Sequence, residues 1–198
     1  MARVLIFGLV ALSGAFTLVG CAPRTLAPIP AASERWVATP TSLAVLSQSG
    51  ELDGVPGALT FGGASGRSAL YLQFPNEWRQ RGAPLAAFLA LEPREDAAND
   101  AESVRVEAWR VRAPWRASAL HTWSDKPELA PPYARSVASS SPPKQLRIDV
   151  TELLRFAAKN PELDHGVALI ASGGAGAGVT FATGMDGGAA PRLEVYAR

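Results

Sequence analysis

Hydrophobic and polar side chains alternate with a period of two along most of the chain after residue 41. Leu70 and Leu72, for example, fall on one side of an extended backbone, and Gln73 falls on the other, as in a half-buried strand. Segments with this pattern, each bounded by Gly, Pro, Ser or Asp, are residues 42–48, 68–74, 84–91, 104–112, 144–150, 166–172, 178–183 and 192–197. Short strands separated by turn residues predict an all-β fold, an antiparallel β-sandwich of two sheets packed face to face.

One short helix is predicted in the C-terminal third of the chain. Thr151 is suited to cap it, and the Asn160-Pro161 pair ends it. The apolar side chains that share one face of this helix, residues 152–159, are Leu153, Leu154, Phe156 and Ala157.

Three segments lack a regular pattern. Residues 21–35 contain several prolines, which remove backbone donors and fix φ, so a tether is predicted there. Residues 95–102 form an acidic stretch that predicts a solvated loop. Four prolines and a serine run in residues 130–144 predict irregular structure over most of that length.

The N-terminal segment, residues 1–20, has the pattern of a secretory signal peptide. Arg3 is its single charged side chain, an apolar stretch follows, and Gly20 is small enough for a cleavage site. The apolar stretch, at about 16 residues, is shorter than the roughly 20 that a membrane-spanning helix needs. We therefore assign these residues to targeting and expect a tether at 21–35 and one folded domain at 36–198.

The sequence Leu18-Val19-Gly20-Cys21 resembles the lipobox of bacterial lipoproteins. That resemblance implies that Cys21 receives a diacylglycerol, that the chain is cut before it, and that the new amino terminus is acylated. It would place the protein in the cell envelope, anchored to a membrane by acyl chains. Ala22, which is not acidic, favours the outer membrane, facing the periplasm or the cell surface. The alternatives are a signal peptide without lipidation or an uncleaved N-terminal anchor, with Cys21 incidental.

Composition restricts the classes of partner and of chemistry. Cys21 is the single cysteine, so no internal disulfide can form. Outside residues 1–20, 18 basic side chains balance 18 acidic ones, which argues against nucleic acid as a partner.

Four stretches in order resemble the DNRLRE domain, the disaggregatase-related or family 96 carbohydrate-binding module. Arg67 leads a strand that ends at Phe74, Thr122-Trp123 is followed closely by a proline, and Asp149 opens an Asp-Val-Thr motif before a short helix. The stretches are residues 67–74, 82–91, 106–127 and the C-terminal set 148–151, 166–169 and 191–195. The resemblance implies a jelly-roll-like sandwich, with Trp115 and Trp123 anchoring loops. The Asp-Asn-Arg-Leu-Arg-Glu sequence that gives the family its name is missing from this chain. The Glu that the family has between the two tryptophans is also missing.

The sequence has no arrangement of residues that is typical of a catalytic or metal site. His121 and His165 are the two histidines and have no ligand spacing, so we expect structural roles for them and no metal site or cofactor. The glycine-rich residues 62–66 have no following lysine or helix signal, so a loop between strands is expected there, not a phosphate site. No spacing singles out a catalytic pair among the candidate carboxylates Asp53, Asp125, Glu128 and Asp149, and Asp149 is expected to cap the chain before the helix. We expect no enzyme.

Aromatic side chains are the remaining binding chemistry, because sugar rings stack on indoles and phenols. Trp109, on a strand, is expected to pack. Trp78, in a polar string, and Tyr133, after two prolines, are expected to be exposed and are the candidate ligand-binding residues. The sequence thus favours a lipid-anchored, non-catalytic envelope module that binds polysaccharide. The alternative is an envelope scaffold or assembly lipoprotein that docks on a protein partner; a contiguous apolar patch would favour it, whereas a shallow groove lined by aromatic and amide side chains would favour a glycan.

Overall fold

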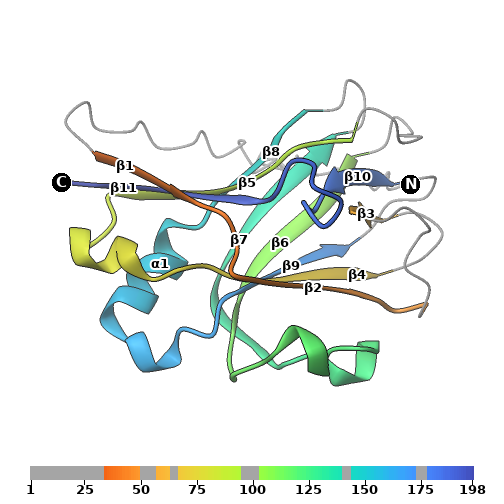
Figure 1. Ribbon diagram of the computed structural model, residues 1–198, viewed down its shortest axis with the longest axis horizontal. Helices are drawn as coiled ribbons and strands as arrows, with labels where there is room; N and C mark the ends of the chain where they lie inside the picture. The colour runs from red at the N-terminus through yellow and green to blue at the C-terminus, as the bar shows by residue number, and fades with distance from the viewer. Residues whose placement is uncertain (1–33, 50–56, 63–66, 95–102, 140–143, 173–177) are drawn as a thin grey trace, which may run out of the picture.

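The computed structural model describes residues 34–49, 57–62, 67–94, 103–139, 144–172 and 178–198 of this 198-residue chain. These residues form a β-sandwich with one α-helix (Figure 1). The four-stranded sheet has the order β1 (Glu34–Ala38), β11 (Arg192–Ala197), β5 (Ala86–Leu91), β8 (Leu146–Asp149). The five-stranded sheet has the order β2 (Ser42–Ser47), β4 (Ser68–Gln73), β9 (Val167–Ser172), β6 (Ser103–Val111), β7 (Leu129–Ser139). A separate pair is formed by β3 (Ala58–Phe61) and β10 (Val179–Ala182).

The strand pairs are nested as in a jelly roll. The first strand pairs with the last, β1 with β11, and inside this pair follow β4 with β9, β5 with β8 and β6 with β7. Every strand pair in the part that the structure describes is antiparallel. Such nesting is that of one long hairpin rolled into two facing sheets. The predicted all-β, jelly-roll-like sandwich is confirmed.

The alternating residues fill the space between the sheets. Leu70 and Leu72 of β4 face Leu89 of β5 and Val195 of β11 across this space, and all four are buried. The β3–β10 pair joins the same core, with the rings of Phe61 and Phe181 5.8 Å apart. The period-two pattern therefore reports which side of each strand faces the partner sheet.

Helix α1 (Thr151–Lys159) packs at one end of the sandwich and buries Leu153, Leu154 and Ala157 against the core. The prediction that Thr151 caps it is wrong, because Thr151 is its first residue and Val150 occupies the cap position without a side-chain bond. The Thr151 hydroxyl instead accepts a hydrogen bond from the backbone N–H of Ala87 on β5, at 2.9 Å. Asp149 does cap the chain before the helix, because its Oδ1 accepts the N–H of Thr151 at 3.0 Å.

The prediction of irregular structure over residues 130–144 is wrong for most of that segment, because β7 runs from Leu129 to Ser139. β7 is the edge strand of its sheet, where prolines are tolerated. The register jumps there from Tyr133 opposite Trp109 to Ala130 opposite Arg110, so the two prolines between them, which have no N–H to donate, fall in an interruption of the ladder. The strand pattern also missed β3, and β1 begins at Glu34, inside the predicted tether.

The outer face of the five-stranded sheet is partly covered by residues 112–128, here called the cover segment. It contains two short 3₁₀ helices, η2 (Ala117–Ala119) and η3 (Trp123–Asp125). Trp115 and Leu120 from this segment form a second apolar cluster with Tyr71 of β4. The Trp115 indole meets the Tyr71 ring edge-on at 5.8 Å and donates a hydrogen bond to the carbonyl of His165 at 2.8 Å. Trp115 therefore anchors this loop, as expected.

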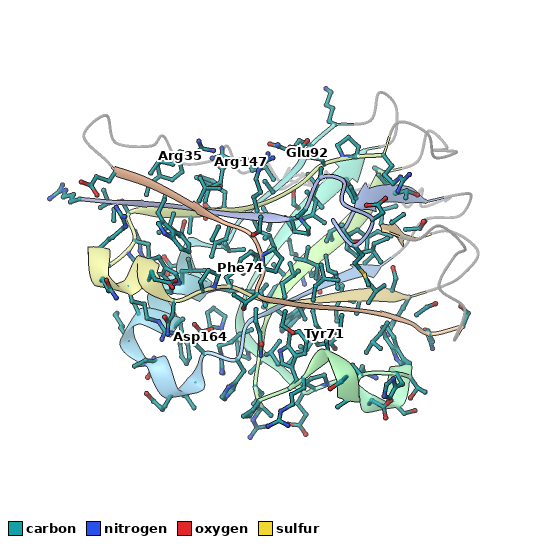
Figure 2. All side chains as sticks on the ribbon, in the orientation of Figure 1. Arg35, Tyr71, Phe74, Glu92, Arg147 and Asp164 are labelled. Carbon is teal, nitrogen blue, oxygen red and sulfur yellow. The ribbon has the colours of Figure 1, made fainter. Side chains whose placement is uncertain are left out.

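The opposite outer face, on the four-stranded sheet, carries charged side chains. Figure 2 shows Arg35, Arg147 and Glu92 on that side of the molecule, and Tyr71 on the far side, toward the cover segment. The two outer faces are thus chemically different.

Candidate functional site

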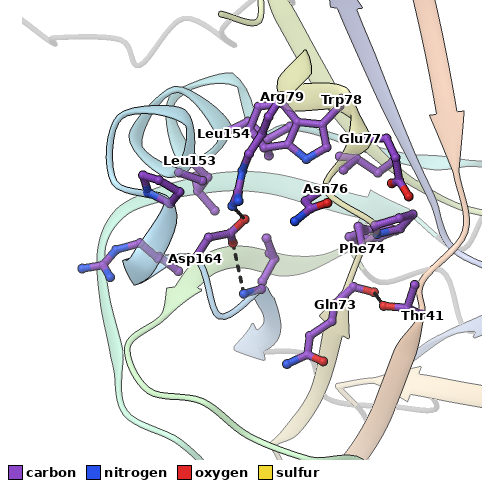
Figure 3. A pocket seen from close by; sticks show the side chains of 17 residues that line it. Thr41, Gln73, Phe74, Asn76, Glu77, Trp78, Arg79, Leu153, Leu154 and Asp164 are labelled. Atoms are coloured by element: carbon purple, nitrogen blue, oxygen red, sulfur yellow. Dashed lines mark hydrogen bonds and ion pairs between the residues drawn. The ribbon is translucent and has the colours of Figure 1, made fainter. Parts of the chain in front are cut away.

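A groove opens at the end of the sandwich where α1 and two 3₁₀ helices, η1 (Glu77–Arg81) and η4 (Pro161–Leu163), lie together (Figures 1 and 3). Its volume is about 510 Å³. Polar side chains at the groove are Thr41, Gln73, Asn76, Glu77, Arg79, Arg110 and Asp164. Aromatic and aliphatic lining is provided by Phe74, Pro75, Trp78, Leu153, Leu154, Ala157, Pro161, Val167 and Leu193, with Gly166 between them. The groove therefore combines an apolar lining with amide, hydroxyl and charged groups.

Trp78 lines this groove, but the prediction that it is exposed is wrong. Its side chain is 3% exposed and belongs to the main core, beside Leu153 and Leu154 of α1. The polar string around it folds into η1, in which Trp78 is the buried residue while Asn76 and Glu77 remain exposed. The single large apolar residue in this polar string is the one that the short helix turns toward the core, so it does not offer an exposed ring for a ligand.

An ion pair crosses the groove from η1 to the segment after η4. The Arg79 Nη2 donates to Asp164 Oδ2, and both side chains are about three-quarters buried. Asp164 Oδ1 also accepts the N–H of Gly166 at 3.2 Å. Gly166 has φ +94°, and a Cβ there would lie 2.2 Å from the carbonyl oxygen of Leu72, so only glycine fits. The hydrogen bond and the tight packing at Gly166 therefore hold residues 164–166 in the position where Asp164 pairs with Arg79.

Arg79 keeps one donor without a partner. Its Nε is buried and makes no hydrogen bond to any residue that the structure describes. A buried donor left unsatisfied in this way is unfavourable by roughly 1–3 kcal/mol.

The amide groups at the groove rim are positioned by the end of β4. Thr41 Oγ1 donates to the carbonyl of Gln73 at 3.2 Å, and the Gln73 amide reaches the carbonyl of Trp115 at 3.4 Å. The Asn76 side chain is exposed and makes no hydrogen bond to any residue that the structure describes. Asn76 is therefore open to a ligand.

The groove lining has balanced charge. It contains the cations Arg79 and Arg110 and the anions Glu77 and Asp164, and no histidine lines it. Arg110 is held by a bond from its Nε to the carbonyl of Pro131 at 3.1 Å and lies 4.4 Å from the centre of the Phe156 ring. Among the described ranges, no three His, Cys, Asp or Glu side chains come close enough to hold a metal ion. The arrangement is equipped to bind through hydrogen bonds and apolar contact.

The carboxylates considered as catalytic candidates are dispersed. Asp125 accepts hydrogen bonds from Thr122, whose backbone N–H bond to it holds the pKa of Asp125 below its ordinary value. Glu128 pairs with Arg112 at 2.8 Å in the cover segment. Asp149 caps the chain before α1, and Asp53 lies outside the described residues. None of the described three lines the groove.

Tyr133 is exposed, as predicted, but it is not in the groove. Its side chain is 41% exposed on the outer face of β7 and stacks on Trp109 of β6, with ring centres 4.2 Å apart and planes 17° apart. The Arg135 guanidinium lies 4.9 Å over the same Tyr133 ring. We call this arrangement, Trp109, Tyr133 and Arg135, the ring stack.

A carboxylate, that of Glu107, bridges two members of the ring stack. Glu107 accepts from Trp109 Nε1 at 3.0 Å and from Arg135 Nε at 2.7 Å. The Tyr133 ring therefore already contacts Trp109 and Arg135, and the polar groups of these two residues already share an acceptor in Glu107. Trp109 packs, as expected. The two sequence candidates, Trp78 and Tyr133, are not brought together.

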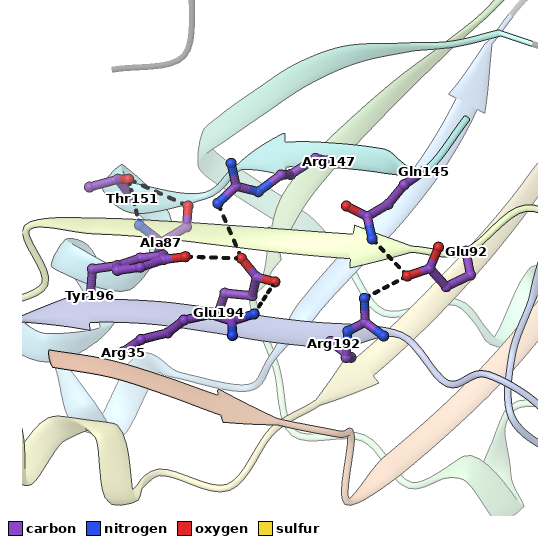
Figure 4. A network of polar contacts seen from close by, with 9 residues as sticks. All are labelled: Arg35, Ala87, Glu92, Gln145, Arg147, Thr151, Arg192, Glu194 and Tyr196. Carbon is purple, nitrogen blue, oxygen red and sulfur yellow. Dashed lines mark hydrogen bonds and ion pairs between the residues drawn. The ribbon is translucent and has the colours of Figure 1, made fainter. Parts of the chain in front are cut away.

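The sequence pattern did not predict the charged network on the outer face of the four-stranded sheet (Figure 4). Glu194 accepts from Arg35 at 2.8 Å and from Arg147 at 3.1 Å, while Glu92 accepts from Gln145 at 2.7 Å and from Arg192 at 2.5 Å. Burial alone would raise the pKa of Glu194, but its bonds to the two arginines hold that pKa below its ordinary value. This network ties β1, β11 and β8 together and has a structural explanation.

Sequence reasoning also missed the groove residues Asn76, Arg79 and Asp164. They come from two connections that are far apart in the chain, after β4 and after α1, and neither has a motif. The one local signal was the Asp-x-Gly turn at residues 164–166, where the carboxylate binds the glycine N–H.

Cys21, the predicted lipid-attachment residue, lies outside the described residues. Within the ranges that the structure does describe, no helix has the length and apolarity to cross a membrane. None of the known protein-family models matches this chain, and no curated protein matches it significantly.

Proposed function

We propose that this chain is a lipid-anchored, non-catalytic module of the bacterial cell envelope, similar to the DNRLRE domain, and that it binds polysaccharide in the groove. The observation that carries the proposal is the lining of the groove, which pairs Phe74 and other apolar side chains with the open amide of Asn76. Sugar rings have apolar C–H faces and hydroxyl edges. A groove with both kinds of group matches both parts of a sugar.

The charge and shape of the groove support a saccharide over a protein partner. Its two cations and two anions leave no net charge to select a strongly charged polymer along its length. The large apolar side chains that are exposed in the described ranges, Val37, Tyr133, Val137, Leu163 and Met185, are spread over β1, β7, η4 and the turn before β11. This distribution differs from the contiguous apolar patch of a protein-docking surface.

Affinity electrophoresis tests binding in the groove. The full chain is run in gels containing dextran, laminarin, xyloglucan or galactomannan, and is also sedimented with peptidoglycan sacculi. The detergent carries no sugar or phosphate, such as lauryldimethylamine oxide. We expect retention by at least one glycan and its loss in Asn76→Trp, whose indole would fill the groove. The matched control Val137→Trp adds the same ring to an exposed site on β7 and should bind as the wild type does.

Folding of both variants is checked by circular dichroism. Migration that no glycan changes, with the fold intact, would overturn the proposal. Equal retention of the wild type and Asn76→Trp would place binding elsewhere.

The anchor is tested separately. Residue Cys21 is expected to carry acyl chains, and two or more of them hold a protein on a membrane, because each buried methylene contributes about 0.8 kcal/mol. Cells grown with labelled palmitate should label the wild-type protein and should not label Cys21→Ser. Label that persists in Cys21→Ser would contradict lipidation at this residue.

A further inference from the structure

A second pocket lies beside the groove, between α1 and the connection from η1 to β5. Its volume is also about 510 Å³, and it is lined by Arg79, Gly82, Ala83, Arg155, Ala158 and Lys159. We call it the cationic pocket. Arg79 is the one lining residue that it shares with the groove. The side chain of Arg79, held by Asp164, therefore stands between two adjacent spaces.

The charge of the cationic pocket differs from that of the groove. Three of its lining side chains are cations and none is acidic, whereas the groove lining has two of each sign. Helix α1 ends at Lys159, and its terminal carbonyls contribute a partial charge of about −0.5. Arg79 pairs with Asp164 and Arg155 with Glu152, so Lys159 is the lining cation without an ion-pair partner in the described ranges, and its full charge exceeds that contribution.

Arg155 is held in place mainly by backbone groups. Its Nε donates to the carbonyl of Pro84 at 3.1 Å and its Nη2 to that of Leu85 at 3.0 Å, and neither bond neutralises its charge. Its one carboxylate partner is Glu152, at 2.7 Å, in a pair whose side chains are 42% and 71% exposed. An ion pair this exposed to solvent is weak, so an anion in the pocket can compete with it.

A further donor group is open. Lys159 is exposed and forms no ion pair within the described ranges. Ammonium and guanidinium donors bind anionic oxygens about twice as strongly as neutral ones. The cationic pocket thus offers unused donors to one chemical class.

We propose that the cationic pocket binds an anionic substituent, a carboxylate, sulfate or phosphate group, on the glycan whose neutral part lies in the groove. This inference rests on the proposed function. Arg79 borders both parts of such a ligand.

Three polymers with one backbone test the inference: dextran, carboxymethyl dextran and dextran sulfate, at about 0.15 M salt, where long-range attraction is screened. We expect the full chain to bind both charged derivatives more tightly than dextran. Arg155→Gln with Lys159→Gln should reduce binding of the charged derivatives by about tenfold, the size expected when charge-assisted hydrogen bonds are lost. The control Arg116→Gln with Lys144→Gln removes two exposed cations elsewhere and should change binding by less than about twofold.

Because Arg155 bonds to backbone carbonyls, its substitution can also disturb the fold. Lys159→Gln alone, at an exposed site, is therefore a second variant, and we expect it to weaken binding of the charged derivatives by roughly threefold. Equal binding of dextran and its charged derivatives, or equal losses in the pocket and control variants, would overturn the inference. If Asn76→Trp leaves all binding intact while the pocket variants lose the charged polymers, the pocket stands and the groove proposal fails. If neutral glycans are retained but charge makes no difference, the groove proposal stands alone.

Discussion

The groove and the outer face of the five-stranded sheet are both rich in aromatic side chains, yet they differ in how these side chains are occupied. On the outer face, the ring of Tyr133 stacks on Trp109 and contacts Arg135, and Trp115 of the cover segment lies against Tyr71. In the groove, Phe74 and the wall formed by Trp78 border an open space of about 510 Å³ with the free amide of Asn76 at its rim.

The difference shows that exposure of a ring is a poor guide to binding. Tyr133 is far more exposed than Trp78, but its ring already stacks on Trp109 and contacts Arg135. We therefore assign stability to the outer face and binding to the groove. Substitutions on the outer face should change the free energy of unfolding and leave binding intact, and substitutions at the groove rim should do the reverse.

Removing the anchor of the cover segment should have the largest effect. Trp115→Ala deletes a buried indole that packs on Tyr71 and bonds to the carbonyl of His165. We expect the free energy of unfolding to fall by about 3–4 kcal/mol, typical of Trp→Ala in a core. Urea denaturation followed by circular dichroism measures it. A loss below 1 kcal/mol would mean that the cover segment does not stabilise the sheet.

The buried Tyr71 hydroxyl should make the stability of the protein depend on pH in the alkaline range. Its hydroxyl is buried without a partner, and burial raises its pKa to about 12 from 10.0. The folded state therefore retains the proton more strongly than the unfolded state, so this contribution to stability is complete below pH 10 and is lost as the pH rises toward 12. Relative to Tyr71→Phe, the wild type should lose about 2 kcal/mol over that window. Parallel alkaline unfolding curves for the two proteins would contradict this.

At neutral pH, Tyr71→Phe should stabilise the protein by about 1 kcal/mol, because it removes a buried hydroxyl that makes no hydrogen bond. Thermal unfolding at pH 7 measures this gain. A destabilised variant would show that the hydroxyl has a partner in solution.

At the groove rim, Asn76→Ala should weaken glycan binding by roughly fivefold, as expected for the loss of one hydrogen bond, and should leave stability within about 0.5 kcal/mol. The Asn76 side chain supports no other residue, and its backbone, with φ −102° and ψ 7°, is open to alanine. Titration calorimetry with the retained glycan measures the affinity. A stability loss above 1 kcal/mol with unchanged affinity would place Asn76 in the scaffold instead.

Truncation of Tyr133 should have the smallest effect. Tyr133→Ala removes one partner of the ring stack at an exposed site, and we expect a loss of about 0.5–1 kcal/mol in stability. Affinity for the retained glycan should not change. If Tyr133→Ala abolishes retention while Asn76→Ala does not, the roles of the two regions are reversed.

The sandwich could be predicted from the sequence because one physical cause, burial of the side chains that face the partner sheet, acts along the core strands. Leu70 and Leu72 face the core as predicted, but β4 is buried on its other side as well, because the cover segment packs on Tyr71. β7 could not be predicted, because an edge strand tolerates Pro131 and Pro132 where the ladder is interrupted, and prolines in a sequence otherwise indicate a loop.

The groove could be predicted only in part. Trp78 was singled out as a binding residue and does line it, but as a buried wall, because η1 turns the indole inward. Arg79 and Asp164 meet only through the tertiary fold, 85 residues apart in the chain. No local pattern reports a contact of that kind.

The most direct test of binding in the groove uses the two indoles as reporters. The full chain, labelled with ¹⁵N, is titrated with an oligosaccharide cut from the glycan that retains it most strongly. The Nε1–H signal of Trp78, in the groove wall, should shift on binding, and that of Trp109, bonded to Glu107 in the ring stack, should stay in place. A shift of the Trp109 signal with Trp78 unchanged would contradict the account.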